Sequence, residues 1–154
     1  MILSAGILLY RFKKEPEFLL VHPGGPFWAK KDPGAWSIPK GEYQPGSDPL
    51  EAAKREFEEE TGQSISGNFI LLTPLKQKSG KIISAWAVEG EFDPVKLHSN
   101  TFMMEWPPRS GKQKEFPEVD RAGWFGLDTA REKIIPGQLG FLEELNRLIK
   151  PPRE

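Results

Sequence analysis

Four glutamates follow an arginine in the stretch REFEEETG, residues 55–62: Glu56, Glu58, Glu59 and Glu60, after Arg55. Like charges three or four positions apart on a helix repel each other by roughly a few tenths of a kcal/mol per pair. This crowding costs stability unless something neutralises it. A divalent cation would do so, because hard carboxylate oxygens are the ligands that Mg²⁺ and Mn²⁺ prefer. Such a cation can also clamp a phosphoryl oxygen and lower the pKa of a bound water.

Helical spacing sorts these side chains into faces. Glu56, Glu59 and Glu60 share one face by i, i+3, i+4 spacing. The adjacent stripe is apolar and is expected to pack on a sheet; it contains Leu50, Ala53 and Phe57. Two interpretations remain open from the helix alone: a metal site and an ordinary solvated acidic face.

The elements that must position this face can be predicted from local signals. The sequence predicts a helix over Pro49–Thr61, with Asp48 as N-cap and Gly62 at its end. Further predicted helices cover 128–134 and 138–149, and predicted strands cover 2–12, 17–22, 36–39, 69–76, 82–92, 101–106 and 123–125. Residues 23–36 and 40–47 are predicted as loops, because they are rich in Gly and Pro. The fold class that accommodates these elements is α/β, with helices on both faces of a mixed sheet.

Composition excludes several other function classes. The 154 residues fit one domain, 1–154, and the formal net charge of −1 argues against a nucleic-acid binder. There is no cysteine, and the two histidines, His22 and His98, receive no role. Thiolate and multi-histidine zinc sites are therefore excluded, so any metal must have mainly oxygen ligands. No apolar run approaches about 18 residues, which predicts no membrane span and a cytoplasmic location.

Together with the loop before it, this helix resembles the signature of the MutT-like Nudix hydrolases. The family pattern is G-x5-E-x7-R-E-U-x-E-E-x-G-U, where U is a bulky apolar residue. It is matched in register by Gly41, Arg55, Glu56, Phe57, Glu59, Glu60 and Gly62. The approach GAWSIPKGEYQPG and the later segment EFPEVDRAGWFGLDTA are also similar to the family, so the resemblance covers most of the chain. It implies an α/β/α sandwich with a mixed sheet and hydrolysis of a nucleoside diphosphate linked to another group.

The resemblance also implies roles for individual residues. Glu56, Glu59 and Glu60 would hold Mg²⁺ or Mn²⁺, commonly joined by the backbone carbonyl of Gly41. Arg55 would orient a catalytic glutamate. The general base varies within the family between a signature glutamate, here Glu59, and one from a later loop. On that later loop the first candidate is Glu118 and the second is Glu115.

Two positions depart from the family pattern. Ser47 stands where a glutamate is expected, and Gln63 stands where an apolar residue is expected. In the family the first glutamate ties the loop to the helix arginine. We therefore hypothesise that Glu51 pairs with Arg55 instead.

Candidate substrate contacts lie before the helix. Lys40 precedes Gly41 and can act as a point charge against a polyphosphate, and Lys30, Lys31 and Lys81 could add to it. Trp36 is the predicted aromatic platform for a nucleobase, with Trp28 and Trp86 also available. The alternative is that the loop aromatics cap an open end of the core.

The entry WSIPKG resembles that of the dinucleoside polyphosphate hydrolases. We rank dinucleoside polyphosphates such as diadenosine tetraphosphate first, nucleoside triphosphates second and ADP-ribose third. A non-catalytic nucleotide-binding module is the alternative of a different class. The expected partner is a small nucleotide, with neither nucleic acid nor membrane, and the protein is expected to be a monomer or a homodimer.

Overall fold

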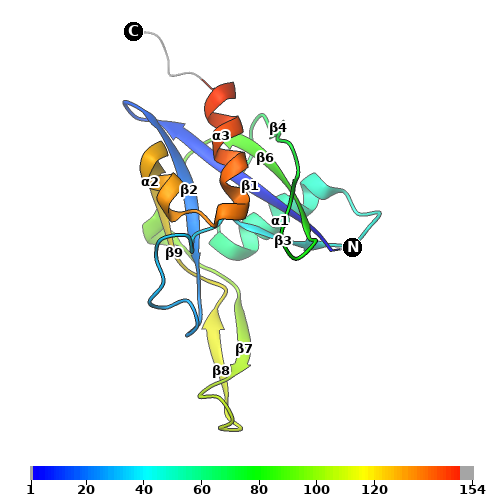
Figure 1. The fold of residues 1–154 in the computed structure, drawn as a ribbon, viewed down its shortest axis with the longest axis vertical. Coiled ribbons are helices and arrows are strands. Elements are labelled where there is room, and N and C mark those ends of the chain that lie inside the picture. Colours follow the sequence, from blue (N-terminus) through cyan, green and yellow to red (C-terminus); the bar gives the residue numbers. More distant parts are fainter. Residues whose placement is uncertain (1, 150–154) are drawn as a thin grey trace.

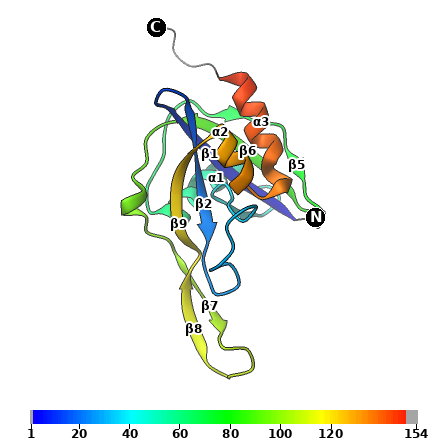
Figure 2. The same cartoon turned by 60° about the vertical axis from the view of Figure 1, so that its left-hand side comes forward.

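A mixed β-sheet with helices on both faces forms the body of the protein (Figures 1 and 2). The computed structural model describes residues 2–149. The strands are β1 (Leu3–Phe12), β2 (Pro16–Pro23), β3 (Lys40–Tyr43), β4 (Ile70–Leu71), β5 (Leu75–Lys76), β6 (Ile82–Glu89), β7 (Thr101–Glu105), β8 (Gln113–Pro117) and β9 (Val119–Gly126). The helices are α1 (Pro49–Thr61), α2 (Leu127–Lys133) and α3 (Leu139–Leu148), with short 3₁₀ turns η1 (Pro94–Lys96) and η2 (Pro136–Gln138). Among residues 2–149 no helix is long and apolar enough to cross a membrane.

Strand β1 organises the sheet. Its first residues pair antiparallel with β3, its last residues pair antiparallel with β2, and β6 runs parallel to it from Leu3 to Tyr10. Strand order across the sheet is β4-β6-β1-β2-β9. The predicted mixed sheet is confirmed, and β3 at its centre leads directly toward α1.

Alternation along β1 divides the core into two layers. Ile7 and Leu9 face α1 and pack with Phe57, while Leu8 faces α3 and packs with Phe141. All five side chains are fully buried. The sheet is therefore covered on both faces, as predicted for an α/β/α sandwich.

Apart from shifts at element ends, four segments differ from the sequence prediction. The strand predicted over residues 69–76 is two short strands, β4 and β5, which pair separately with β6. Residues 36–39 are not a strand; Trp36 and Ser37 make only isolated bridges, to Ile134 and Val21. Lys40–Tyr43, predicted as loop, is strand β3, because its backbone pairs with β1. The polar stretch before residue 119 contains strand β8, which pairs with β7. The partner of β3 is remote in sequence and leaves no local signal, whereas β8 is missed because its residues are mostly polar and exposed.

The β7–β8 hairpin extends away from the body of the sheet (Figures 1 and 2). Its base is held by backbone hydrogen bonds from Gly24 N to Glu118 O, 2.9 Å, and from Glu118 N to Asn100 O, 2.8 Å. Asn100 N in turn donates to Glu59 O at 2.8 Å. This chain of bonds fixes Glu118 beside the C-terminal half of α1.

Candidate functional site

Both ends of α1 are fixed by local structure. The Asp48 side chain accepts a hydrogen bond from Leu50 N at 3.1 Å, and Pro49 occupies the first turn. Gly62 ends the helix with φ 81°, in the left-handed region that favours glycine. A side chain there would lie 2.7 Å from the carbonyl oxygen of His98. The glutamates therefore occupy the last turns of a helix whose predicted bounds are confirmed.

Strand β3 lies directly against the acidic face. A Cβ added at Gly41 would collide with the Glu56 carboxylate, so only glycine leaves room for it. Lys40 N donates to the Glu60 carboxylate at 3.3 Å. The backbone of residues 40–41 thus lies against two of the three glutamates, Glu56 and Glu60. This is the arrangement that the signature requires.

Burial and mutual repulsion shift the acid–base properties of this face. Burial raises the pKa of Glu60 from about 4.5 to about 8, although the neighbouring Lys40 opposes the shift. Burial also raises the pKa of Glu56, and the charge of Glu59 adds to it. Burial and the nearby Lys81 lower the pKa of Lys40. The cluster therefore carries a cost that a bound cation would relieve.

Glu118 joins the cluster from the other side. Burial raises the pKa of its carboxyl group, and the charge of Glu59 adds to the shift. By contrast, Glu115 lies on β8, is exposed and accepts a hydrogen bond from the Thr101 hydroxyl at 2.6 Å. The structure brings Glu118, and not Glu115, to the glutamate face.

Arg55 lies over the outside of the same turn. Its guanidinium is 3.4 Å from Glu56 and 3.7 Å from Glu59. The hypothesis that Glu51 pairs with Arg55 is wrong, because Glu51 pairs with Lys54 at 3.3 Å. Ser47 is exposed, and among residues 2–149 the side-chain partners of Arg55 are Glu56 and Glu59 instead. Arg55 is held by the acidic face itself.

A small pocket of about 190 Å³ opens beside the cluster. Its functional lining combines one aromatic ring, one ammonium and two carboxylates: Trp28, Lys40, Glu60 and Glu118. Its other lining residues are Val21, Pro23, Ser37, Ile38, Val119 and Ile135. An aromatic wall next to a lysine and carboxylates suits a nucleotide whose base stacks and whose phosphates meet the charged end.

The aromatic prediction needs a correction. Trp36 is only 5% exposed, and its Nε1 donates to Asp32 at 2.7 Å. It packs edge-on against Phe125 in the core, so its ring is not available to a ligand. Trp28, on the same loop, lines the pocket instead. Lys30 is exposed and does not line it.

The residues fit a divalent cation by chemistry and charge. Three carboxylates and the Gly41 carbonyl are hard oxygen donors, and Gly41 leaves space for Glu56. Within residues 2–149, however, no three acidic or histidine side chains are closed around a metal position. Glu60 is turned to Lys40 N, and Glu59 to Arg55. Binding would need side-chain rotations within one helical turn.

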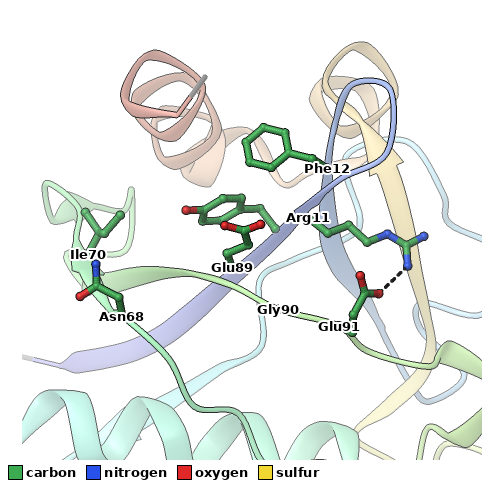
Figure 3. Close-up of a pocket in the computed structure, with 8 residues that line it drawn as sticks. Arg11, Phe12, Asn68, Ile70, Glu89, Gly90 and Glu91 are labelled. Carbon is green, nitrogen blue, oxygen red and sulfur yellow. Dashed lines mark hydrogen bonds and ion pairs between the residues drawn. The ribbon is translucent and has the colours of Figure 1, made fainter. Parts of the chain in front are cut away.

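A larger concavity lies elsewhere. A groove of about 550 Å³ at the ends of β1 and β6 is lined by Tyr10, Phe12 and Glu89, among others (Figure 3). In it Arg11 pairs with Glu91 at 3.0 Å. None of the α1 glutamates lines this groove. The chemistry suggested by the sequence therefore belongs to the smaller pocket.

Comparison with known proteins gives one family match. Residues 2–145 match the NUDIX domain family. No curated protein sequence gives a significant match.

Solved structures extend the likeness to the fold. The binary complex of a C. elegans Ap4A hydrolase is 21% identical with a TM-score of 0.65, covering 94% of this chain and 96% of that one. The NUDIX domain of Shewanella oneidensis NrtR complexed with ADP ribose is 15% identical with a TM-score of 0.66, covering 97% and 89%. The MutT of Aliivibrio salmonicida or Vibrio cholerae is 15% identical with a TM-score of 0.57, covering 94% of each chain. At these identities the likeness establishes the fold.

Proposed function

This chain belongs to the NUDIX domain family and is a pyrophosphohydrolase of nucleoside diphosphate-linked substrates, and from that premise we propose a specific substrate, site and metal. The proposed substrate is a dinucleoside polyphosphate such as diadenosine tetraphosphate. The proposed site is the acidic face of α1 together with the pocket lined by Trp28, Lys40 and Glu118.

One observation carries the substrate proposal: an aromatic ring and a lysine line the same pocket as the carboxylates of the reaction centre. Trp28 would stack a base, which contributes roughly 1–3 kcal/mol. Lys40 lines this pocket and can meet a phosphate chain as a point charge, and the charge of the nearby Lys81 helps to lower the pKa of Lys40. The Ap4A hydrolase among the structural neighbours supports the same substrate class.

The family typically uses divalent metals. In this chain Glu56, Glu59, Glu60 and the Gly41 carbonyl would hold Mg²⁺ or Mn²⁺. When bound, the cation would offset the carboxylate charges and polarise a phosphoryl oxygen. Arg55, 3.7 Å from Glu59 and 3.4 Å from Glu56, would keep both side chains on the reacting face.

Glu118 is the proposed general base. Water attacks a phosphorus atom, a new P–O bond forms, the anhydride P–O bond breaks and the proton of the water passes to the Glu118 carboxylate. A raised pKa makes this carboxylate a stronger base nearer neutral pH, which suits the task. Glu59 is the alternative base, on the opposite side of the same cluster.

The test is hydrolysis of a panel of dinucleoside polyphosphates, nucleoside triphosphates, nucleotide sugars and ADP-ribose, with Mg²⁺ and in ¹⁸O-labelled water. We expect the highest kcat/KM for a dinucleoside polyphosphate, with the label in one phosphate product. A higher kcat/KM for a nucleoside triphosphate would replace the proposed substrate by the second-ranked class. ADP-ribose as the preferred substrate would replace it by the ligand seen with the NrtR domain.

A further inference from the structure

A buried histidine lies in the chain between two residues that line the pocket, Val21 and Pro23. His22, at the end of β2, is fully buried, with 0% of its surface exposed. Its Nδ1 lies 2.8 Å from an Asp120 carboxylate oxygen, and its Nε2 lies 2.7 Å from the carbonyl oxygen of Lys31. The ring also packs edge-on against Trp36, with centroids 5.2 Å apart. The side chain therefore joins β2, β9 and the loop between β2 and β3.

Both polar partners of this ring are acceptors. A neutral imidazole has one N–H, so it can donate to a carboxylate or to a carbonyl, but not to both. Arg121 Nε lies 3.6 Å from the same Asp120 oxygen. Each ring nitrogen of His22 nevertheless lies within hydrogen-bond distance of an oxygen, so the side chain links the Asp120 carboxylate to the Lys31 carbonyl.

The contact of His22 with the Lys31 carbonyl holds the aromatic wall of the pocket. Lys31 N donates to Trp28 O at 2.9 Å, and the Lys31 ammonium lies 5.0 Å from the centre of the Trp28 ring. The same loop is anchored a second time, since Lys133 Nζ contacts the Asp32 carboxylate at 2.7 Å. His22 is thus two residue contacts away from Trp28.

The contact of His22 with Asp120 holds the carboxylate wall of the pocket. Asp120 follows Glu118 by two residues at the start of β9, and Glu118 lines the same pocket as Trp28. Pro23, next to His22 in the chain, lines it as well. The imidazole therefore connects the segment that carries the aromatic ring to the segment that carries the proposed base.

We infer that His22 is a positioning residue that fixes the Trp28 loop against the Glu118 segment and so sets the affinity of the pocket for its nucleotide. It touches no substrate, and it acts through the Lys31 carbonyl and Asp120. This role rests on the proposed function of the pocket, whereas the clamp itself is a property of the fold.

The test substitutes His22→Phe, which keeps a ring against Trp36 and removes both hydrogen bonds. Hydrogen exchange at the Trp28 and Lys31 amides should accelerate at least about 10-fold, while exchange in β1 stays unchanged. With the best substrate of the panel, KM should rise about 10-fold and kcat should change less than about 3-fold. His22→Gln, which can still donate to the carbonyl, should recover part of both effects.

A double-mutant cycle with Trp28→Ala tests whether His22 acts on the pocket through Trp28. If His22 acts through Trp28, His22→Phe adds little to the KM of Trp28→Ala. Phe141→Leu, in the α3 layer, serves as a variant of similar stability loss and should leave KM unchanged. Unchanged exchange at Trp28 and Lys31 would overturn the clamp, and so would additive KM effects in the cycle or an equal KM rise in Phe141→Leu.

Two further results have defined meanings. If His22→Phe does not fold, His22→Gln takes its place in the exchange measurement and in the cycle, with smaller expected changes. If wild type hydrolyses no member of the panel, the proposed function fails, and amide exchange alone decides the clamp.

Discussion

Glu56, Glu59 and Glu60 share one face but differ in environment. Glu60 is the most strongly shifted, with a pKa raised to about 8, whereas the Glu59 side chain is 38% exposed and paired with Arg55. Helical spacing predicted that these side chains converge. It could not predict their burial, because the covering residues come from β3 and from the loop before β9.

The tryptophans show the same limit at the level of single side chains. Trp36 and Trp28 lie on one loop, and neither composition nor spacing separates them. Packing against Phe125 and the bond to Asp32 bury Trp36, while Trp28 lines the pocket. The contact with Phe125 joins residues far apart in the sequence, so a local sequence pattern cannot reveal it.

Replacing Glu118 tests its proposed role as base. Glu118→Gln keeps the size of the side chain and removes its basicity, so kcat should fall about 100-fold or more with little change in KM. Glu115→Gln, on the exposed side of β8, should leave kcat within about 2-fold. Steady-state kinetics of the two variants provide the comparison. Wild-type kcat in Glu118→Gln would transfer the role to Glu59.

Replacing Trp28 tests the aromatic wall. Trp28→Ala should raise KM about 10-fold or more, because base stacking contributes roughly 1–3 kcal/mol. Trp28→Phe keeps an aromatic face and should recover most of the loss. Equal KM for Trp28→Ala and wild type, measured with the preferred substrate, would exclude stacking on this ring.

Helix α1 was predicted to the residue because its end signals are local. Asp48, Pro49 and Gly62 act within one turn of their own positions. Strand β3 cannot be predicted from local signals, because it forms by pairing with the backbone of β1. The paired residues, such as Leu3 and Tyr43, are more than thirty positions apart. The close approach of β3 to α1 is nevertheless what makes Gly41 part of the site.

The β3–α1 contact can be tested at Gly41. Gly41→Ala should displace the Glu56 side chain, since the added Cβ has no other space, and kcat/KM should fall about 10-fold or more. Tm should change little, because the displaced group is the end of a flexible side chain. Gly126→Ala is a matched control, with φ −65° and open space around the added Cβ, and it should be near wild type. Full activity in Gly41→Ala would separate Glu56 from the site.

The buried Glu60 carboxyl group on α1 should also make the stability of the fold depend on pH. In metal-free protein the folded state holds the Glu60 proton up to a pH of about 8, whereas the unfolded chain releases it near pH 4.5. The unfolded state therefore binds fewer protons in this window, and the free energy of unfolding should fall as pH rises from 5 to 8. The expected fall is on the order of a few kcal/mol.

Urea unfolding at several pH values in the presence of EDTA measures this slope. Glu60→Gln should lose most of it, and Glu58→Gln, on the exposed side of α1, should retain it. Asp32 and Glu143 have lowered pKa values, so their contributions fall below pH 4.5, whereas the raised pKa values of Glu56 and Glu118 should leave a smaller slope in Glu60→Gln. A slope that is equal in Glu60→Gln and wild type would show that Glu60 is not the buried acid.

At the scale of the whole molecule, the layers were predictable and the connections were not. Alternating strands and two separated helices implied a mixed sheet covered on both faces, and Figure 1 shows that arrangement. The β7–β8 hairpin was not foreseen, because strand β8 (QKEFP) is polar, has little strand signal and pairs outside the main sheet. Yet the base of this hairpin brings Glu118 to α1.

The central claim is that the acidic face of α1 is a metal-dependent hydrolytic centre. The most direct measurement is the rate of hydrolysis of the preferred substrate against Mg²⁺ concentration, for wild type, Glu59→Gln and the exposed-face control Glu58→Gln. Saturable Mg²⁺ dependence is expected in wild type and Glu58→Gln, with a rate at least about 100-fold lower in Glu59→Gln. A wild-type rate that persists in EDTA, or one that Glu59→Gln retains, would contradict the claim.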